Sequence, residues 1–325
     1  MNAPTPSEVV LAAKDQWPDT MKLITWLWAH SYAIKPREQH WLFRKLRQQF
    51  RVDVNRTVRL RTGEWCSVDV FDFIGGEIAR NGYYEAETIE LFLRVLEPGM
   101  VVLDAGAHVG QYSLISSTIV GAGGHVYSFE PEPRNYARLA RNIKMNRRDN
   151  VTAVNAALSD APSRLRFHLA IASNSGGHSL AHTGCSSDDT IIVEATTIDT
   201  YVARQNIKRI DFLKADVEGA ELPLLRGAQE SITRFRPVLV VEGSVHSKGF
   251  GYETPELAQF IESNGYQVFL VDEHGLTPRP QAWPSQEYFN ILGIPLERID
   301  RLSSRLGRLF GSQEALPQYD RGEAA

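Results

Sequence analysis

The chain has 325 residues, of which 43% are hydrophobic and 23% charged, and its formal net charge is −4. This composition suits a globular α/β core with an appendage, and because it leaves no strong basic field we expect no nucleic-acid partner. The longest apolar cluster, residues 23–29, is too short for a membrane span, and residues 1–7 lack the pattern of a secretory signal. Cys66 and Cys185 have no metal-ligand spacing, which is typical of a reducing compartment, so we expect a cytoplasmic protein.

The first part of the chain predicts helices and a hairpin ahead of the main domain. Residues 7–50 have helical apolar spacing with a break near Pro36, and their tryptophans indicate either a homodimer interface or a substrate lid. Residues 52–74 alternate polar and apolar side chains around a turn at 62–64, as in a β-hairpin. We therefore expect residues 1–82 to form a helical and hairpin extension that acts as a lid or in dimerisation.

Beyond this extension strands and helices alternate, which predicts a mostly parallel sheet covered by helices on both faces. The last strand, 288–293, is expected to be the antiparallel edge of a seven-stranded sheet. We expect this domain to span residues 83–297, and residues 298–325 to form a short helix and a disordered tail. The other expected strands lie near 101–104, 125–129, 151–154, 210–215, 237–242 and 267–271, with helices near 86–96, 110–120, 133–146, 197–204, 220–229 and 255–264, and two extra strands near 164–170 and 190–195.

A glycine turn after the first core strand is the most informative motif. The apolar run 101–103 ends at Asp104, and the chain then passes through Gly106 and Gly110 into a helix. Gly106 permits a sharp turn close to a ligand, and Gly110 permits close packing of helix and strand. Free N–H groups at the helix N-terminus suit a carboxylate, whereas Asp104 suits a cationic group. S-adenosylmethionine (SAM) carries both kinds of charge.

An acid at the end of the second core strand indicates how a ribose would be held. Glu130 follows the run 125–129, and its carboxylate is placed to accept both ribose hydroxyls. NAD enzymes share such an acid, but their fingerprint is Gly-x-Gly-x-x-Gly, whereas this turn reads Asp-x-Gly-x-x-x-Gly. The spacing favours SAM as the cofactor, and an NAD-linked oxidoreductase is the alternative.

Several motifs between residues 83 and 242 occur in an order known from one family. They are GYYEAET, LDAGAHVGQYS, FEPEPRN, NAALSD, NSGGHSL, IDFLKADVEGAELPLLRGA and RPVLVVE, and the segment DVEGAE is the most specific of them. With these motifs the chain resembles the FkbM-type family of SAM-dependent methyltransferases. Residues 1–80 and the tail match weakly.

The resemblance implies a class I methyltransferase fold, Rossmann-like with seven strands, and methyl transfer from SAM, usually to a hydroxyl oxygen. Family acceptors include macrolide and sugar hydroxyls. We therefore expect a SAM-dependent O-methyltransferase acting on a small or medium polar metabolite of sugar or polyketide type. The family turn more often carries Asn where this chain has His108, which we expect to keep a polar lining at the cofactor. A SAM-binding scaffold without chemistry is a further alternative.

Other residues near the turn are expected to complete the cofactor site. Tyr84 and Glu85 precede the first core helix and are expected to close over the methionine end of SAM. The third core strand ends at Asn155, Ala156 and Ala157, which we expect to edge the adenine through backbone groups and small side chains.

Methyl transfer to a hydroxyl needs an aligned acceptor and a group that takes its proton. In this fold the end of the strand 210–215 lies beside the transferable methyl, so Asp216 is the first candidate for the base or orienting group as well as a cofactor contact. Glu218 is the second candidate, although either acid alternatively caps the following helix. Glu242, which ends the next strand, and His246 form the second acid/base pair.

The surroundings of these acids leave alternatives open. A buried Lys214 needs a partner, and an ion pair with a nearby carboxylate fits as well as a substrate contact. Asp216, Glu218 and Glu242 are hard oxygen ligands able to hold Mg²⁺ against an acceptor diol, but they lack an established metal-site spacing, so we expect no metal. The polar loop 172–180 indicates either a lid or an exposed loop.

Overall fold

The computed structural model describes residues 55–70, 72–170, 175–181, 186–272, 275–284 and 288–307. The chain divides into two units, Met1–Asp53 and Val54–Ala325, and only the second contains described residues. The helices expected over 7–50 and the tail beyond residue 307 lie outside the described residues. Within those ranges, no helix has both the length and the apolar character that crossing a bilayer requires.

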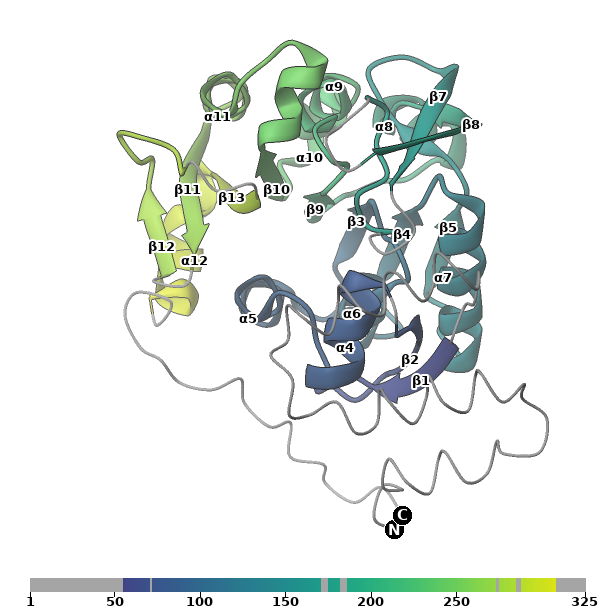
Figure 1. The fold of residues 1–325 in the computed structure, drawn as a ribbon. Helices are drawn as coiled ribbons and strands as arrows, with labels where there is room; N and C mark the ends of the chain where they lie inside the picture. Colours follow the sequence, from purple (N-terminus) through teal and green to yellow (C-terminus); the bar gives the residue numbers. More distant parts are fainter. Residues whose placement is uncertain are drawn as a thin grey trace, which may run out of the picture. The chain divides into compact units, whose positions relative to one another are not determined.

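An eight-stranded sheet forms the centre of the described unit (Figure 1). The five strands from β10 to β5 run parallel, while β13 is antiparallel to both of its neighbours. Strands such as β3, with the sequence VVLDA, are apolar and buried along nearly their whole length, as expected where helices cover both faces. Across the sheet the order is β12 (Gly275–Pro278), β11 (Tyr266–Asp272), β13 (Tyr288–Pro295), β10 (Val238–Ser244), β9 (Phe212–Ala215), β3 (Val101–Ala105), β4 (His125–Phe129) and β5 (Val151–Val154).

The sheet differs from the sequence prediction in two ways. It has eight strands rather than seven, because β12 pairs with β11 beyond the expected set. The prediction that the last strand lies at the edge is wrong, since β13 is inserted between β10 and β11. Nearly all of β13 is buried, so its side chains need neighbours on both sides, whereas the short β12 ends in exposed residues and suits an edge.

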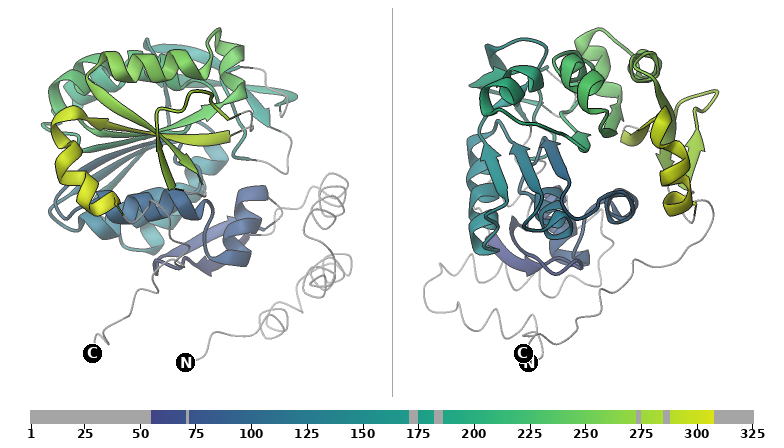
Figure 2. Two further views of the ribbon diagram at one scale, coloured as in Figure 1. Left: turned by 90° about the vertical axis from the view of Figure 1, so that its left-hand side faces the viewer. Right: turned by 180° about the vertical axis from the view of Figure 1, so that it is seen from behind.

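Helices cover both faces of this sheet (Figure 2). One face packs against α5, α6 and α12, and the opposite face packs against α8 to α11. The bounds are α5 (Ala86–Val95), α6 (Gln111–Val120), α8 (Ile198–Gln205), α9 (Glu221–Arg226), α10 (Gln229–Phe235), α11 (Thr254–Ser263) and α12 (Ile299–Leu306), with 3₁₀ turns η2 (Val245–Phe250) and η3 (Leu296–Arg298).

The single helix expected over 220–229 is two helices, α9 and α10. They are separated near Gly227, where a Cβ would lie 2.1 Å from the carbonyl oxygen of Ser159. The chain thus approaches a neighbouring backbone too closely for any side chain, and the helix is interrupted at this contact.

The hairpin expected within residues 52–74 is present as β1 (Asn55–Arg59) and β2 (Trp65–Asp69), followed by α4 (Phe73–Asn81). It is bonded to α7 (Pro133–Met145) through the fully buried Asn142. The Asn142 side chain accepts the N–H of Ser67 at 2.8 Å and donates to the carbonyl oxygens of Ser67 at 3.2 Å and Val109 at 2.8 Å. This amide therefore ties the hairpin to the turn that leads into α6.

A small second sheet occupies the region where the alternation of strands and helices breaks. Its order is β6-β8-β7, with β8 antiparallel to β7 and parallel to β6. The two extra strands expected from the sequence correspond to β7 and β8. The bounds are β6 (Ala157–Leu158), β7 (Ser163–Ala170) and β8 (Ser186–Thr196).

Candidate active site

The glycine turn after β3 is packed against the segment that follows β9. Gly106 has φ +77°, and a Cβ at this position would lie 1.7 Å from the carbonyl oxygen of Asp216. Gly110 has φ +95°, and its Cβ would meet Leu139 Cδ1 of α7 at 2.6 Å. Both residues therefore need the left-handed backbone that glycine adopts without strain. The close approach of the Asp216 backbone also excludes any side chain at position 106, and the sequence does not indicate this contact.

Glu130 follows β4 directly and receives backbone N–H groups from two sides. Its Oε2 accepts from the His108 N–H and its Oε1 from the Glu132 N–H, each at 2.9 Å. Burial raises the pKa of the Glu130 carboxyl to about 8, against the opposing effect of these two donors. The carboxyl group thus lies beside the glycine turn, as the sequence predicts for an acid that binds a ribose.

His108 links the turn to the polar loop after β7. Its backbone is left-handed, with φ +50°, and its ring Nε2 lies 2.7 Å from Ser175 Oγ. Burial lowers the pKa of His108 and favours the neutral ring. Further along the loop, Ser179 Oγ donates to the carbonyl oxygen of Glu218 at 2.7 Å. The described part of the loop, residues 175–181, is therefore bonded both to the glycine turn and to the segment after β9.

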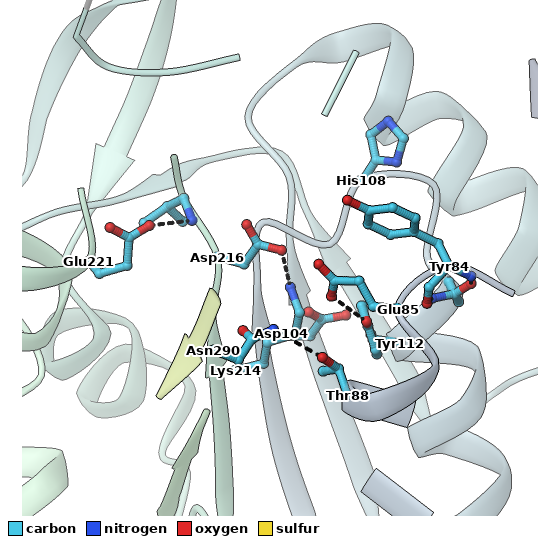
Figure 3. Close-up of polar contacts among 12 residues, drawn as sticks. Tyr84, Glu85, Thr88, Asp104, His108, Tyr112, Lys214, Asp216, Glu221 and Asn290 are labelled. Carbon is cyan, nitrogen blue, oxygen red and sulfur yellow. Dashed lines mark hydrogen bonds and ion pairs between the residues drawn. The ribbon is translucent and has the colours of Figure 1, made fainter. Parts of the chain in front are cut away.

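A buried lysine of β9, Lys214, points toward Asp216 (Figure 3). Lys214 is 2% exposed, donates to Asp216 Oδ2 at 2.8 Å, and lies 4.8 Å from the centroid of the Tyr112 ring. Burial alone would lower the pKa of Lys214, but the charges of Asp216 and Asp104 raise it and keep the ammonium group charged. Of the two alternatives for this lysine, the structure shows the ion pair.

Asp104 lies inside the sheet next to Lys214, its register partner on β9. The carboxyl group is fully buried, and its Oδ2 accepts from Ser113 Oγ at 2.6 Å. Burial raises the pKa of Asp104, while Lys214 and Ser113 act in the opposite direction. A direct contact of Asp104 with the cofactor stays a prediction.

Tyr84 and Glu85 lie across the site from Asp216 (Figure 3). The Gln111 side chain holds Tyr84 by accepting its N–H at 2.8 Å and donating to its carbonyl oxygen at 2.9 Å. Glu85 has φ +56° at the start of α5, and its Oε2 accepts from the Tyr112 hydroxyl at 2.7 Å. Burial and the charge of Asp216 raise the pKa of Glu85. The charge effect indicates that Glu85 and Asp216 share one local environment.

Three carboxylates converge at the carboxyl end of β9 and the neighbouring part of β10, which continues past Glu242 to Ser244 where it pairs with β13. Asp216, Glu218 and Glu242 each offer one oxygen, and these oxygens lie within 4.8 Å of one another. The two strands are parallel neighbours, so acids at their carboxyl ends meet at one edge of the sheet. Burial, with the charges of Asp216 and Glu218, raises the pKa of Glu242 well above its ordinary value.

Glu221 holds the turn that presents Glu218. It is fully buried, and its Oε1 accepts from the N–H groups of Val217 at 2.9 Å and Gly219 at 3.1 Å. Glu218 has φ +55°, and a Cβ on Gly219 would lie 2.7 Å from the carbonyl carbon of His246. The turn is therefore packed directly against the loop after β10.

His246 joins this loop to β13. Its Nε2 lies 2.7 Å from the Tyr288 hydroxyl and 3.9 Å from Glu218 Oε2. The acid beside His246 is thus Glu218, whereas the sequence pattern predicts a pair of His246 with Glu242.

The end of the third core strand lies against Glu130. Asn155 donates from Nδ2 to the carbonyl oxygens of Glu130 at 2.9 Å and Pro131 at 3.0 Å. Ala156 is half-buried, and Ala157 is buried at the start of β6. The contacts of Asn155 put this residue next to the predicted ribose site, and a role of Ala156 and Ala157 at the adenine stays a prediction.

A cavity of about 350 Å³ adjoins the carboxylate cluster. Its wall includes β13, where Phe289 stacks on Trp283 with 5.9 Å between ring centroids, and Asn290, whose Nδ2 donates to Thr88 Oγ1 at 3.0 Å. None of the described residues that line this cavity is basic. The polar lining residues are Glu85, Glu87, Thr88, Glu242, Asp272, Tyr288 and Asn290.

Sequence reasoning missed part of this lining. Tyr288 and Asn290 begin β13, and because this strand is antiparallel its first residues, not its last, lie at the carboxyl edge of the sheet. Assigning β13 correctly between β10 and β11 would have identified them. Thr88, which lies within α5, carries no comparable signal in the sequence, and neither does Tyr112 of α6, which bonds to the lining residue Glu85.

The strand order places an antiparallel strand beside the fifth of five parallel strands, and the glycine turn and Glu130 lie at the carboxyl ends of the two parallel strands β3 and β4. This arrangement is that of the class I methyltransferases, which use SAM. A family model described as Methyltransferase FkbM domain matches residues 104–268, just over half of the chain. The chain belongs to the FkbM methyltransferase family, and its cofactor is SAM.

Curated relatives are similar to this chain at low identity. The hexuronic acid methyltransferase AglP of Haloferax volcanii is 26% identical over 48% of this chain and 61% of its own length. The 2-O-methyltransferase NoeI of Sinorhizobium fredii is 27% identical over 43% of this chain and 62% of its own length. The 31-O-demethyl-FK506 methyltransferase FkbM of Streptomyces tacrolimicus is 29% identical over 55% of this chain and 78% of its own length. The chain thus spans about six-tenths of the first two relatives.

Among solved structures, the methyltransferase FkbM of Methylobacillus flagellatus KT is 18% identical to this chain, with a TM-score of 0.40. The match covers 63% of this chain and 50% of that one.

Proposed function

We propose that this protein is a SAM-dependent O-methyltransferase that acts on a hydroxyl group of a small or medium polar metabolite, of sugar or polyketide type. The observation that carries the proposal is the convergence of Asp216, Glu218 and Glu242 beside a cavity at the carboxyl edge of the sheet. Open α/β folds bind ligands at this edge, and the glycine turn for the cofactor lies against Asp216.

In the proposed reaction the acceptor oxygen forms a bond to the methyl carbon of SAM. The bond between that carbon and the sulfonium sulfur breaks, and its electron pair stays on sulfur, which leaves S-adenosylhomocysteine. The hydroxyl proton passes to Asp216, with Glu218 beside it as the second candidate. Alignment supplies most of the rate, and the base adds about 10²–10⁴-fold. Glu130, His108 and the glycine turn would hold the cofactor.

The cavity lining supports an uncharged or cationic acceptor rich in hydroxyl groups. Glu85, Glu87, Glu242 and Asp272 offer hydrogen-bond acceptors, and an anionic acceptor would meet these acids without a basic lining residue to balance its charge. Phe289 offers an apolar face of the kind that packs against a sugar ring. The relatives named for hexuronic acid and for 2-O-methylation support a carbohydrate acceptor, and the acidic lining favours a neutral or aminated sugar over a uronic acid.

A panel of acceptors tests this proposal. With methyl-labelled SAM, a neutral glycoside, an amino sugar and a uronic acid of the same ring form are compared for label transfer. We expect transfer to the first two and little to the third. Transfer to the uronic acid alone would contradict the acceptor class, and no transfer to any hydroxyl compound in a broad panel, with SAM bound, would favour the non-catalytic scaffold.

The affinity for SAM is expected to rise with pH because of Glu130. The pKa of this carboxyl is about 8 in the cofactor-free chain, so the neutral form predominates below pH 8, whereas ribose hydroxyls are best accepted by the ionised form. Between pH 6 and 8 the dissociation constant should fall by up to about tenfold per pH unit. Calorimetry in this range measures it, and Glu130→Gln should bind more weakly with a flatter pH dependence. An affinity for the wild-type chain that falls with pH would contradict the assignment.

A further inference from the structure

We propose that Asp216, Glu218 and Glu242 bind one divalent cation, Mg²⁺ or Mn²⁺, which holds the hydroxyl groups of the acceptor beside the cofactor. The use of the cation rests on the proposed function, but its binding does not. The three side chains come from the end of β9, the turn after it and β10, and one oxygen of each lies within 4.8 Å of the others. Because Mg²⁺ binds oxygens at about 2.0–2.1 Å, small side-chain rotations would bring these oxygens around one cation.

A second observation points to a missing partner at this place. Glu242 is 7% exposed, and its Oε2 is buried without a hydrogen-bond partner among the described residues. An ionised carboxylate buried in this way is costly unless it is paired or coordinates a metal. The oxygen belongs to the member of the cluster that lies on β10, and a cation bound between the three acids would give this carboxylate a partner.

The charges around the cluster also favour a divalent cation. Lys214 donates to Asp216 Oδ2 at 2.8 Å and compensates one of the three carboxylates. His246 has its Nε2 at 3.9 Å from Glu218 Oε2, but the ring also bonds to the Tyr288 hydroxyl. No basic side chain is among the described residues that line the adjoining cavity. A divalent cation would add positive charge at the point where the three carboxylates meet.

The cluster is preorganised rather than assembled from mobile side chains. Glu218 is 13% exposed, its carbonyl accepts from Ser179, and Glu221 bonds the N–H groups on either side of it. Glu242 is fixed within β10, opposite Asn290 of β13. Three protein oxygens would leave positions for water or for two neighbouring hydroxyls of an acceptor at the cavity. A cation there would orient the acceptor and favour loss of its hydroxyl proton.

Metal binding by the full chain tests the proposal directly. After treatment with a chelator, the chain is titrated with Mn²⁺ and followed by electron paramagnetic resonance, with Mg²⁺ as the competitor. We expect one Mn²⁺ site that Mg²⁺ displaces. Glu242→Gln should weaken Mn²⁺ binding at least about tenfold, since even outer partners of a metal site contribute that much. Glu218→Gln, at a side chain more exposed than Glu242, should give the same loss.

Glu87→Gln is the matched control, because Glu87 lines the same cavity outside the cluster, and its Mn²⁺ affinity should equal that of the wild-type chain. Unchanged binding of S-adenosylhomocysteine by Glu242→Gln reports an intact fold. Absence of Mn²⁺ binding by the wild-type chain, or wild-type binding by both Glu242→Gln and Glu218→Gln, would overturn the proposal.

The same preparations separate this proposal from the proposed function. Methyl transfer at full rate in the presence of a chelator would exclude a use of the cation in the reaction, but it would leave the proposed O-methyltransferase activity standing. Binding of Mn²⁺ without methylation of any acceptor would support the metal site and contradict the proposed O-methyltransferase activity.

Discussion

Replacing Asp216 by Asn is expected to lower kcat by about 10²–10⁴-fold. The amide keeps the size of the side chain but neither takes the hydroxyl proton nor attracts a cation. Asp216 also pairs with Lys214 at 2.8 Å, so its replacement removes the charge that holds the ammonium group toward the site. The chain should still fold, because Asp104 remains beside Lys214 within the sheet.

The effect is measured with saturating SAM and the best acceptor of the panel, together with the affinity for S-adenosylhomocysteine. Asp211→Asn is the matched control at the opposite end of β9. Asp211 accepts from the Val101 N–H at 2.8 Å and from Arg209 at 2.7 Å, so its replacement affects stability and should leave kcat unchanged. A value of kcat for Asp216→Asn close to that of the wild-type chain would exclude Asp216 as base or metal ligand.

Replacing Gly106 by Ala is expected to destabilise the fold by about 2–5 kcal/mol. The position has φ +77°, and the added Cβ would lie 1.7 Å from the carbonyl oxygen of Asp216, so β3 or the segment after β9 must move. The same movement displaces Asp216 from the turn, and SAM affinity should fall as well.

Urea unfolding measures this loss of stability. Gly123→Ala is the control, because its Cβ would meet no atom closer than 3.8 Å, and we expect a change within about 0.5 kcal/mol. Equal stability of Gly106→Ala and the wild-type chain would show that the turn is not packed against Asp216.

The core of the sheet could be predicted because its strands are continuous apolar runs that end at acids or glycines. The run at β3 is of this kind, and β4 is followed by the acid Glu130, while alternation with helices implies that the two strands are parallel. The place of β13 could not be predicted in the same way, since an apolar run does not state which neighbours it pairs with. Likewise, the interruption between α9 and α10 depends on the approach of Gly227 to Ser159, far away in the sequence.

In the candidate site, too, some features could be predicted from the sequence and others could not. The proximity of Asp216, Glu218 and Glu242 could be predicted from the sequence. Parallel strands have their carboxyl ends at one edge of the sheet, and the three acids come near those ends. The bond from Tyr112 to Glu85 joins residues 27 positions apart, and that from Asn290 to Thr88 joins residues 202 positions apart. Such side-chain pairs follow from the packing of α5 against α6 and β13, which the sequence pattern does not specify.

The most direct test of the account is the fate of the methyl carbon. The full chain is supplied with ¹³C-methyl SAM and a neutral polyhydroxyl acceptor, and the product is examined by nuclear magnetic resonance. We expect a methyl ether on one hydroxyl oxygen together with one equivalent of S-adenosylhomocysteine. A ¹³C label found on nitrogen or carbon of the acceptor, or S-adenosylhomocysteine formed with no methylated product, would contradict O-methylation at this site.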